Sequence, residues 1–214
     1  MLSGALDLTI ATLIRHSFRR SSALLNNEVS RSWAEILFYY GRGGGDVSPP
    51  SRCKHIFDML DVVSPWAVGR YQNLAELQNS LPQIKADIES ALRAGKLYMP
   101  VIFPGFSWKN LTGGQIRSNQ LPRAGGQFFW DQSRFYSQLG VKTIYIAMFD
   151  ELDKGTAILP LVEQKFSLPV ESHLLALDED GFQLPSDFYL RLVRLISQRA
   201  QAGQGLEPKA PHSL

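Results

Sequence analysis

Three short apolar runs alternate with amphipathic stretches, and this alternation limits the fold more than any other feature of the sequence. The runs cover residues 60–63, 97–103 and 141–149. Strands that are apolar along nearly their whole length are typical of parallel sheets with both faces covered. The sequence therefore predicts an α/β fold in which helices cover a parallel sheet.

The stretches that follow the first two runs, and the last stretch of the chain, have helical spacing. In the first stretch the apolar residues step by three and four, and they are Leu74, Leu77, Leu81, Ile84, Ile88 and Leu92. Asn73 and Glu76 have the spacing of a capping box, and Gly95 stands where a C-terminal cap belongs. Helices are also expected over residues 126–139 and 185–199.

The patterning divides the chain into three parts. Residues 1–52 are weakly patterned, with helices expected near 7–18 and 30–40. Residues 53–200 carry the strand–helix alternation and are expected to form the folded domain. Residues 201–214 are polar and rich in Gly and Pro, so we expect a flexible tail.

Composition excludes several classes of function. The net charge of +2 and the lack of a basic stripe argue against a nucleic-acid partner. Cys53 is the single cysteine, so an internal disulfide is excluded, and no CxxC or HxxxH spacing indicates zinc. We therefore expect no metal and no cofactor. No window has the roughly 20 apolar residues that a membrane span needs.

The cellular compartment and the oligomeric state stay open. The Arg- and Ser-rich stretch 15–22 follows a mildly apolar segment, whereas a secretory signal has the opposite order. The stretch is compatible with a surface helix or with an organellar transit peptide. A cytoplasmic location is the default expectation, with a secreted or organellar location as the alternative.

Functional residue types gather where the three apolar runs end. In parallel sheets, ligand sites lie at the carboxyl ends of the strands. The last run ends in the carboxylates Asp150, Glu151 and Asp153, and glycoside hydrolysis uses such groups to protonate the leaving oxygen and to stabilise the anomeric carbon. The alternative is a solvated turn in which Lys154 neutralises Glu151 or Asp150.

Aromatic and polar residues near these ends suit a sugar ligand. The aromatic candidates are Trp66, Tyr71, Phe106 and Trp108, whose flat rings match the apolar faces of sugars. Core packing is the alternative for each of them. Arg70, Asn110 and Arg123 add side chains that orient hydroxyl groups by hydrogen bonding.

Five motifs in this order resemble the glycoside hydrolase family 71/99-like group, often labelled xylosidase/arabinosidase. They are DVVSPWxVGRY at 61–71, PGFSWxNL at 104–111, PRxGGxFFW at 122–130, AMFDExDxGTAI at 147–158 and DGFxLPSDxYL at 180–190. The resemblance covers about residues 53 to 200. It implies a (β/α)8 (TIM) barrel that hydrolyses O-glycosidic bonds of polysaccharides or oligosaccharides, with family 99 relatives cleaving internal α-mannosidic bonds.

One position departs from the resembled pattern. In family 99 the last catalytic strand leads into Asn-Glu-x-x-Glu-Gly-Thr, and the two glutamates correspond to Glu151 and Lys154 here. The resemblance thus assigns Glu151 a catalytic role, while Lys154 replaces the acid/base residue. We expect Asp150 and Asp153 to support Glu151. A lysine ammonium is a poor proton donor at neutral pH. A non-catalytic carbohydrate-binding protein therefore stays open as the alternative function.

The chain length adds a second departure. A complete barrel of this type takes about 250 residues or more, and three strands are evident in the sequence. We therefore expect a partial barrel, or an incomplete domain that needs a partner.

Overall fold

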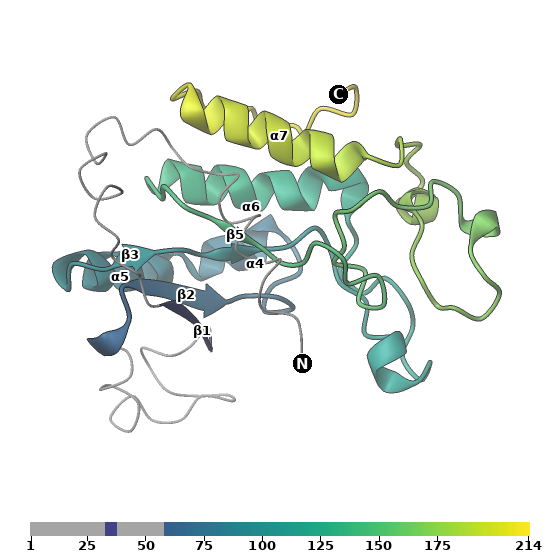
Figure 1. Ribbon diagram of the computed structural model, residues 1–214, viewed down its shortest axis with the longest axis horizontal. Helices are drawn as coiled ribbons and strands as arrows, with labels where there is room; N and C mark the ends of the chain where they lie inside the picture. The colour runs from purple at the N-terminus through teal and green to yellow at the C-terminus, as the bar shows by residue number, and fades with distance from the viewer. Residues whose placement is uncertain (1–32, 38–57) are drawn as a thin grey trace.

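The computed structural model describes residues 33–37 and 58–214. The helix expected near 7–18 lies outside these residues. Among them, the helices α6 (Gln127–Gln138) and α7 (Phe188–Gln201) lie side by side over the strands, and the loops that follow the strands gather at one end (Figure 1). None of the helices in this part of the chain is long and apolar enough to cross a membrane.

All the strands among the described residues pair in parallel, as the apolar runs predict. The strands are β1 (Trp33–Leu37), β2 (Val62–Trp66), β3 (Leu97–Tyr98), β4 (Val101–Ile102) and β5 (Tyr145–Ile146). One sheet has the order β1-β2-β3, and β4 pairs with β5 in a second sheet. The described strands form no closed barrel, so the (β/α)8 expectation is met only to the extent of a partial, parallel arrangement.

Residues 30–40 were expected to be helical, and this prediction is wrong where the structure describes them. Residues 33–37 form β1, which pairs in register with β2 from Trp33↔Val62 to Leu37↔Trp66. The strand β2, whose residues lie 29 positions further along the chain than their partners in β1, stabilises this conformation by pairing with it. Such pairing overrides a weak local pattern.

The expected strand 97–103 is divided between the two sheets. Met99 N–H donates to Val63 O over 2.8 Å, whereas Pro100 O accepts from Tyr145 N–H over 2.9 Å. The backbone groups of successive residues point to opposite sides of a strand, so Leu97 and Met99 donate toward β2 while the carbonyl group of Pro100 faces β5. The expected strand 141–149 is also shorter than predicted, because Met148 N–H donates to Thr156 O instead of to a strand.

The helices lie close to their expected positions, with one division. They are α4 (Leu74–Asn79), α5 (Leu81–Arg93), α6 (Gln127–Gln138) and α7 (Phe188–Gln201). Four single-turn 3-10 helices are also described, η1 (Asn110–Thr112), η2 (Ala124–Gly126), η3 (Lys165–Ser167) and η4 (Leu177–Asp180). The single helix expected over 74–92 ends at Ser80 and restarts, because Pro82 lacks the N–H that a continuous helix would need.

The predicted capping box at the start of α4 is confirmed. Glu76 N–H donates to Asn73 Oδ1 over 3.0 Å. The Glu76 carboxylate reaches back one residue further than in the usual box and accepts from Gln72 N–H over 2.9 Å. Both bonds satisfy backbone donors at the helix start.

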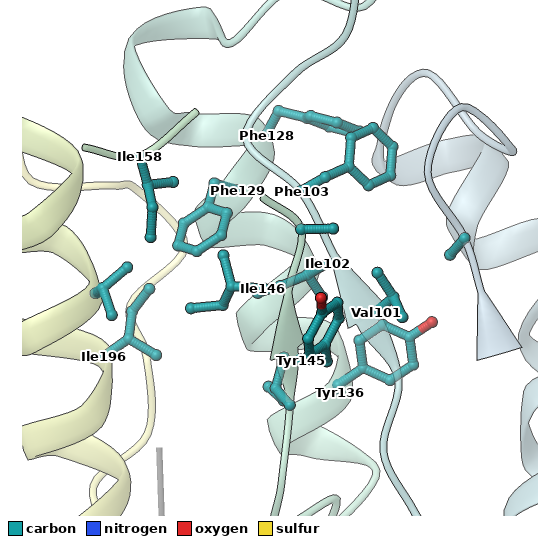
Figure 2. Packing of buried hydrophobic residues seen from close by; sticks show 14 of the residues in the cluster. Val101, Ile102, Phe103, Phe128, Phe129, Tyr136, Tyr145, Ile146, Ile158 and Ile196 are labelled. Carbon is teal, nitrogen blue, oxygen red and sulfur yellow. The ribbon is translucent and has the colours of Figure 1, made fainter. Parts of the chain in front are cut away.

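The core lies between the strands and the helix pair α6 and α7. Figure 2 shows Ile102 from β4, Ile146 from β5, Phe129 from α6 and Ile196 from α7 meeting in one cluster. Each of these side chains is at most 3% exposed. Burial of this apolar surface is the main stabilising contribution to the arrangement.

A polar side chain lies inside this core and is fully bonded. Gln132 on α6 is 0% exposed, and its Nε2 donates to Phe103 O over 2.7 Å and to Phe128 O over 2.9 Å. Its Oε1 accepts from Phe103 N–H and from the Tyr71 hydroxyl, each over 3.1 Å. The amide thus forms hydrogen bonds with both backbone groups of the residue that follows β4. It also binds a side chain from the segment after β2, so it connects these two segments to α6.

The last residues of the chain pack against α6, in contrast to the flexible tail expected over 201–214. Trp130 Nε1 donates to Glu207 O over 2.6 Å, and Gln127 Nε2 donates to Pro208 O over 3.0 Å. Ala210 N–H donates to Gln127 Oε1 over 2.9 Å, and Ala210 is buried. Side chains of α6 therefore form hydrogen bonds with backbone groups of these last residues, which would otherwise bond to water.

We predict that Gln132→Met lowers the free energy of unfolding by about 3 kcal/mol, because buried Phe103 and Tyr71 groups lose their partners. Urea denaturation of the purified chain measures the change. Gln138→Met, on the exposed face of the same helix, is the matched control and should change stability by less than about 0.5 kcal/mol. Equal effects of the two substitutions would contradict the role of the buried amide.

Candidate functional site

The segments that follow β2, β4 and β5 meet at one edge of the molecule. Ser107 N–H, after β4, donates to Lys154 O, after β5, over 2.8 Å. The Trp108 ring lies 3.3 Å from the position that a Cβ on Gly69, after β2, would occupy. The prediction that the strand ends converge is therefore confirmed.

The Glu151 side chain lies at this edge in an ion pair. Its Oε1 lies 2.6 Å from Lys154 Nζ, and the two side chains are 29% and 30% exposed. Asp150 and Asp153 are exposed on either side of Glu151. The structure thus realises the expectation that Lys154 neutralises Glu151, and it leaves the carboxylate accessible to solvent on the same surface.

Asn110 joins the segment after β4 to two other segments. Its Nδ2 donates to Asp153 O over 3.0 Å and to His173 O over 3.5 Å. The amide nitrogen therefore holds the turn that carries Glu151 and Lys154. Asn110 was predicted from the sequence to bind substrate, and in the structure its donor atoms contact the backbone of the protein.

Arg123 supports the Glu151 turn from the interior. It is 6% exposed, and its Nη2 donates to Gly155 O over 2.8 Å and to Ala157 O over 2.9 Å. Its guanidinium group lies over the Tyr189 ring, 4.7 Å from the centroid. Burial raises the pKa of Tyr189, and the positive charge of Arg123 opposes this rise. Arg123 thus contacts the protein where substrate contact was predicted.

Asp180 holds the loop between η1 and α6. Its Oδ1 accepts from Asn119 Nδ2 over 2.5 Å, and its Oδ2 accepts from Ala124 N–H over 2.8 Å. A Cβ on Gly125 (φ +61°) would lie 2.6 Å from Phe182 Cδ1, so this position requires glycine. Sequence reasoning gave Asp180 no role, although the Asp-Gly pair followed by an aromatic residue was a visible signal.

The aromatic candidates divide between the core and the surface. Tyr71 is 1% exposed and donates its hydroxyl to Gln132, and burial raises its pKa well above the ordinary value. Phe106 is 4% exposed and lies beneath Trp108, with ring centroids 4.5 Å apart. Trp108 is 39% exposed, and Trp66 is half-buried. Trp108 is therefore the aromatic candidate that presents the largest fraction of its surface.

Two further apolar side chains are exposed on the loops that meet at this edge. Leu111 is 48% exposed and Leu152 is 41% exposed. Arg70, in the segment after β2, is half-buried. Exposed apolar groups beside a charged pair form a surface of mixed character, which suits a ligand with apolar faces and hydroxyl edges.

Comparisons with known proteins give a likeness of fold. No protein-family model matches the chain, and no curated protein matches it in sequence. A solved structure of the GH99 endo-alpha-mannosidase from Bacteroides thetaiotaomicron matches with a TM-score of 0.55 and 18% identity, over 79% of this chain and 50% of that chain. A structure of the same enzyme in complex with BIS-TRIS-Propane matches with a TM-score of 0.54 and 17% sequence identity. That match covers 73% of this chain and 45% of the other chain.

This chain therefore spans about half the length of the structures that it matches. Over that half its fold is similar to that of a GH99 endo-alpha-mannosidase, in agreement with the fold expected from the sequence motifs. The xylosidase and arabinosidase labels stay predictions.

We predict that Arg123→Met lowers the free energy of unfolding by about 2–4 kcal/mol, because two buried carbonyl groups lose a charged donor. Arg93→Met is the matched control, since Arg93 forms an exposed pair with Glu89 whose side chains are 73% and 66% exposed. That change should cost less than about 0.5 kcal/mol. Urea denaturation compares the two, and a small effect of Arg123→Met would refute the supporting role.

Proposed function

We propose that the chain is a glycoside hydrolase that binds glycans at the edge formed after β2, β4 and β5. The observation that carries the proposal is the position of Glu151, a partly exposed carboxylate in the turn that follows the parallel strand β5, on a fold similar to that of an endo-alpha-mannosidase. Oligosaccharides with α-mannosidic bonds are the first substrates to test for this reason.

Glu151 is the carboxylate that we assign to the reacting centre. A carboxylate in an ion pair suits the role of base or nucleophile, while hydrolysis also requires a proton donor for the leaving oxygen. Asp153 is the carboxyl group that we assign as donor, because it lies two residues from Glu151 on the turn that Asn110 holds. Asp150, exposed on the other side of Glu151, is the supporting carboxylate.

Binding is assigned to side chains with accessible surface. Trp108 offers an aromatic face to a sugar ring, with Trp66 and Arg70 on the neighbouring segment and Lys154 beside the carboxylate. Tyr71, Phe106, Asn110 and Arg123, which were also predicted to bind substrate, act in this proposal by holding these segments in place.

The second candidate function is carbohydrate binding without catalysis. It is favoured by Lys154, which stands where the resembled family has a second glutamate and whose ammonium group lies 2.6 Å from Glu151 Oε1. In this case the ion pair would hold the turn, and the exposed surface around Trp108 would carry the function.

We predict that Trp108→Ala weakens oligosaccharide binding about tenfold, because the stacking face is lost. Isothermal titration calorimetry with mannan, xylan and arabinan oligosaccharides measures the affinity. Phe166→Ala is the matched control, since Phe166 is an aromatic residue 83% exposed on another loop. An unchanged affinity in Trp108→Ala would remove this residue from the site.

We predict that Glu151→Gln lowers the rate of glycoside hydrolysis about 10²–10⁴-fold, because the acting carboxylate is replaced by a neutral amide. Reducing-end assays on the same oligosaccharides measure the rate. If the unaltered chain binds a sugar without hydrolysing it, and Lys154→Glu creates activity, the second candidate holds and only the acid is missing. Lys85→Glu, on the exposed face of α5, controls for the charge change.

A further inference from the structure

Three exposed apolar side chains lie on the two segments that meet at the Glu151 turn. Trp108, Leu111 and Leu152 are 39%, 48% and 41% exposed. They belong to the loops that follow the strands, which Figure 1 shows at one end of the molecule. The proposed function uses the ring of Trp108 and gives the two leucines no role.

Hydrogen bonds hold these segments against each other. Each of the two apolar residues on the segment after β4 directly follows a residue that donates to the Glu151 turn. Ser107 N–H donates to Lys154 O over 2.8 Å, and Asn110 Nδ2 donates to Asp153 O over 3.0 Å. The third apolar residue belongs to the turn itself. The main chain of all three is therefore held close to the proposed glycan site.

The exposed apolar area is too small to be the centre of a protein interface. Even at about 250 Å² for each residue, the size of a large aromatic side chain, the exposed fractions amount to at most about 320 Å². A standard interface takes roughly 800 Å² from each partner.

The charges beside the apolar groups also limit the choice of ligand. Asp150, Glu151 and Asp153 lie on the same turn, with Lys154 as its single cation. Charged residues are depleted from the centres of protein interfaces. A surplus of carboxylates is unsuited to an anionic membrane surface, which attracts basic segments. The surface therefore fits the apolar part of a small ligand.

Aliphatic and aromatic side chains recognise different parts of a ligand. A sugar ring offers its C–H face to a flat ring such as that of Trp108. The branched side chains of Leu111 and Leu152 have no such flat face. They gain most from covering an alkyl group, because hydrophobic burial is non-directional and scales with apolar area. A ligand that satisfies both kinds of side chain is a glycan joined to an alkyl chain.

We propose that this edge of the molecule binds a glycan with an apolar aglycone, the sugar at Trp108 and the alkyl chain against Leu111 and Leu152. The inference rests on the proposed function and specifies its substrate class. That class is a glycoside of an apolar alcohol, in which the sugar and the alkyl chain belong to one molecule.

A ligand-observed NMR titration of the full chain tests the proposal. The probes are the methyl and hexyl glycosides of an α-linked mannobiose, with sulfur in place of each glycosidic oxygen to prevent hydrolysis, and 1-hexanol. We expect the hexyl glycoside to bind about tenfold or more tightly than the methyl glycoside, as for burial of about two of its five additional CH₂ groups. 1-Hexanol should bind more weakly than the hexyl glycoside.

Leu111→Ala and Leu152→Ala should each lower the ratio of hexyl to methyl glycoside affinity about threefold, because part of the alkyl contact is lost. Leu92→Ala is the matched control, since Leu92 is a 63% exposed leucine on α5, and it should leave the ratio unchanged. Thermal unfolding without ligand verifies that the three variants are folded. An unchanged ratio in both site variants would overturn the proposal.

The probes also separate this inference from the proposed function. Equal affinities of the methyl and hexyl glycosides would overturn the inference and leave glycan binding in place. Equal affinities of the hexyl glycoside and 1-hexanol, without binding of the methyl glycoside, would contradict both, because the sugar would then contribute nothing. Absence of binding by all three probes would likewise contradict both.

Discussion

The buried amide of Gln132 is the interaction on which the arrangement of the site depends. It pairs with both backbone groups of Phe103 and with the Tyr71 hydroxyl, so it acts as a neighbour to the end of β4 and as an anchor for the segment after β2. All of these groups are buried, and each would cost free energy if its partner were lost. The two segments therefore keep their places relative to α6, which in turn packs against β4 in the core.

A second interior group does the same for the segment after β5. Arg123 binds the carbonyl oxygens of Gly155 and Ala157, and Tyr189 on α7 covers its guanidinium face. The charged pair of Glu151 and Lys154 on the outside is thus supported by a buried cation behind it. Several residues that motif reasoning placed in contact with a ligand belong to this supporting layer, and the exposed surface is left to Trp108 and the charged pair.

The two ends of the strands differ in their chemistry. The end that carries Glu151 combines carboxylates, a lysine and exposed apolar groups, and the proposed glycan site rests on this combination. At the other end, where α6 and α7 end, the residues that line an open surface depression include Arg134 and Lys142 and no carboxylate. Helices α6 and α7 contribute to the core between these ends.

The sequence by itself determined the α/β class, the parallel pairing, the capping box at Asn73 and the convergence of the strand ends. These features follow from periodicity, from local hydrogen bonds and from the geometry of parallel strands, all of which are encoded within short stretches. Only the tertiary structure decided that residues 33–37 form a strand, that the run 97–103 is divided between two sheets, and that Tyr71 and Arg123 face the interior. Each of these depends on a partner far away in the chain, and no local pattern specifies which partner will be in contact.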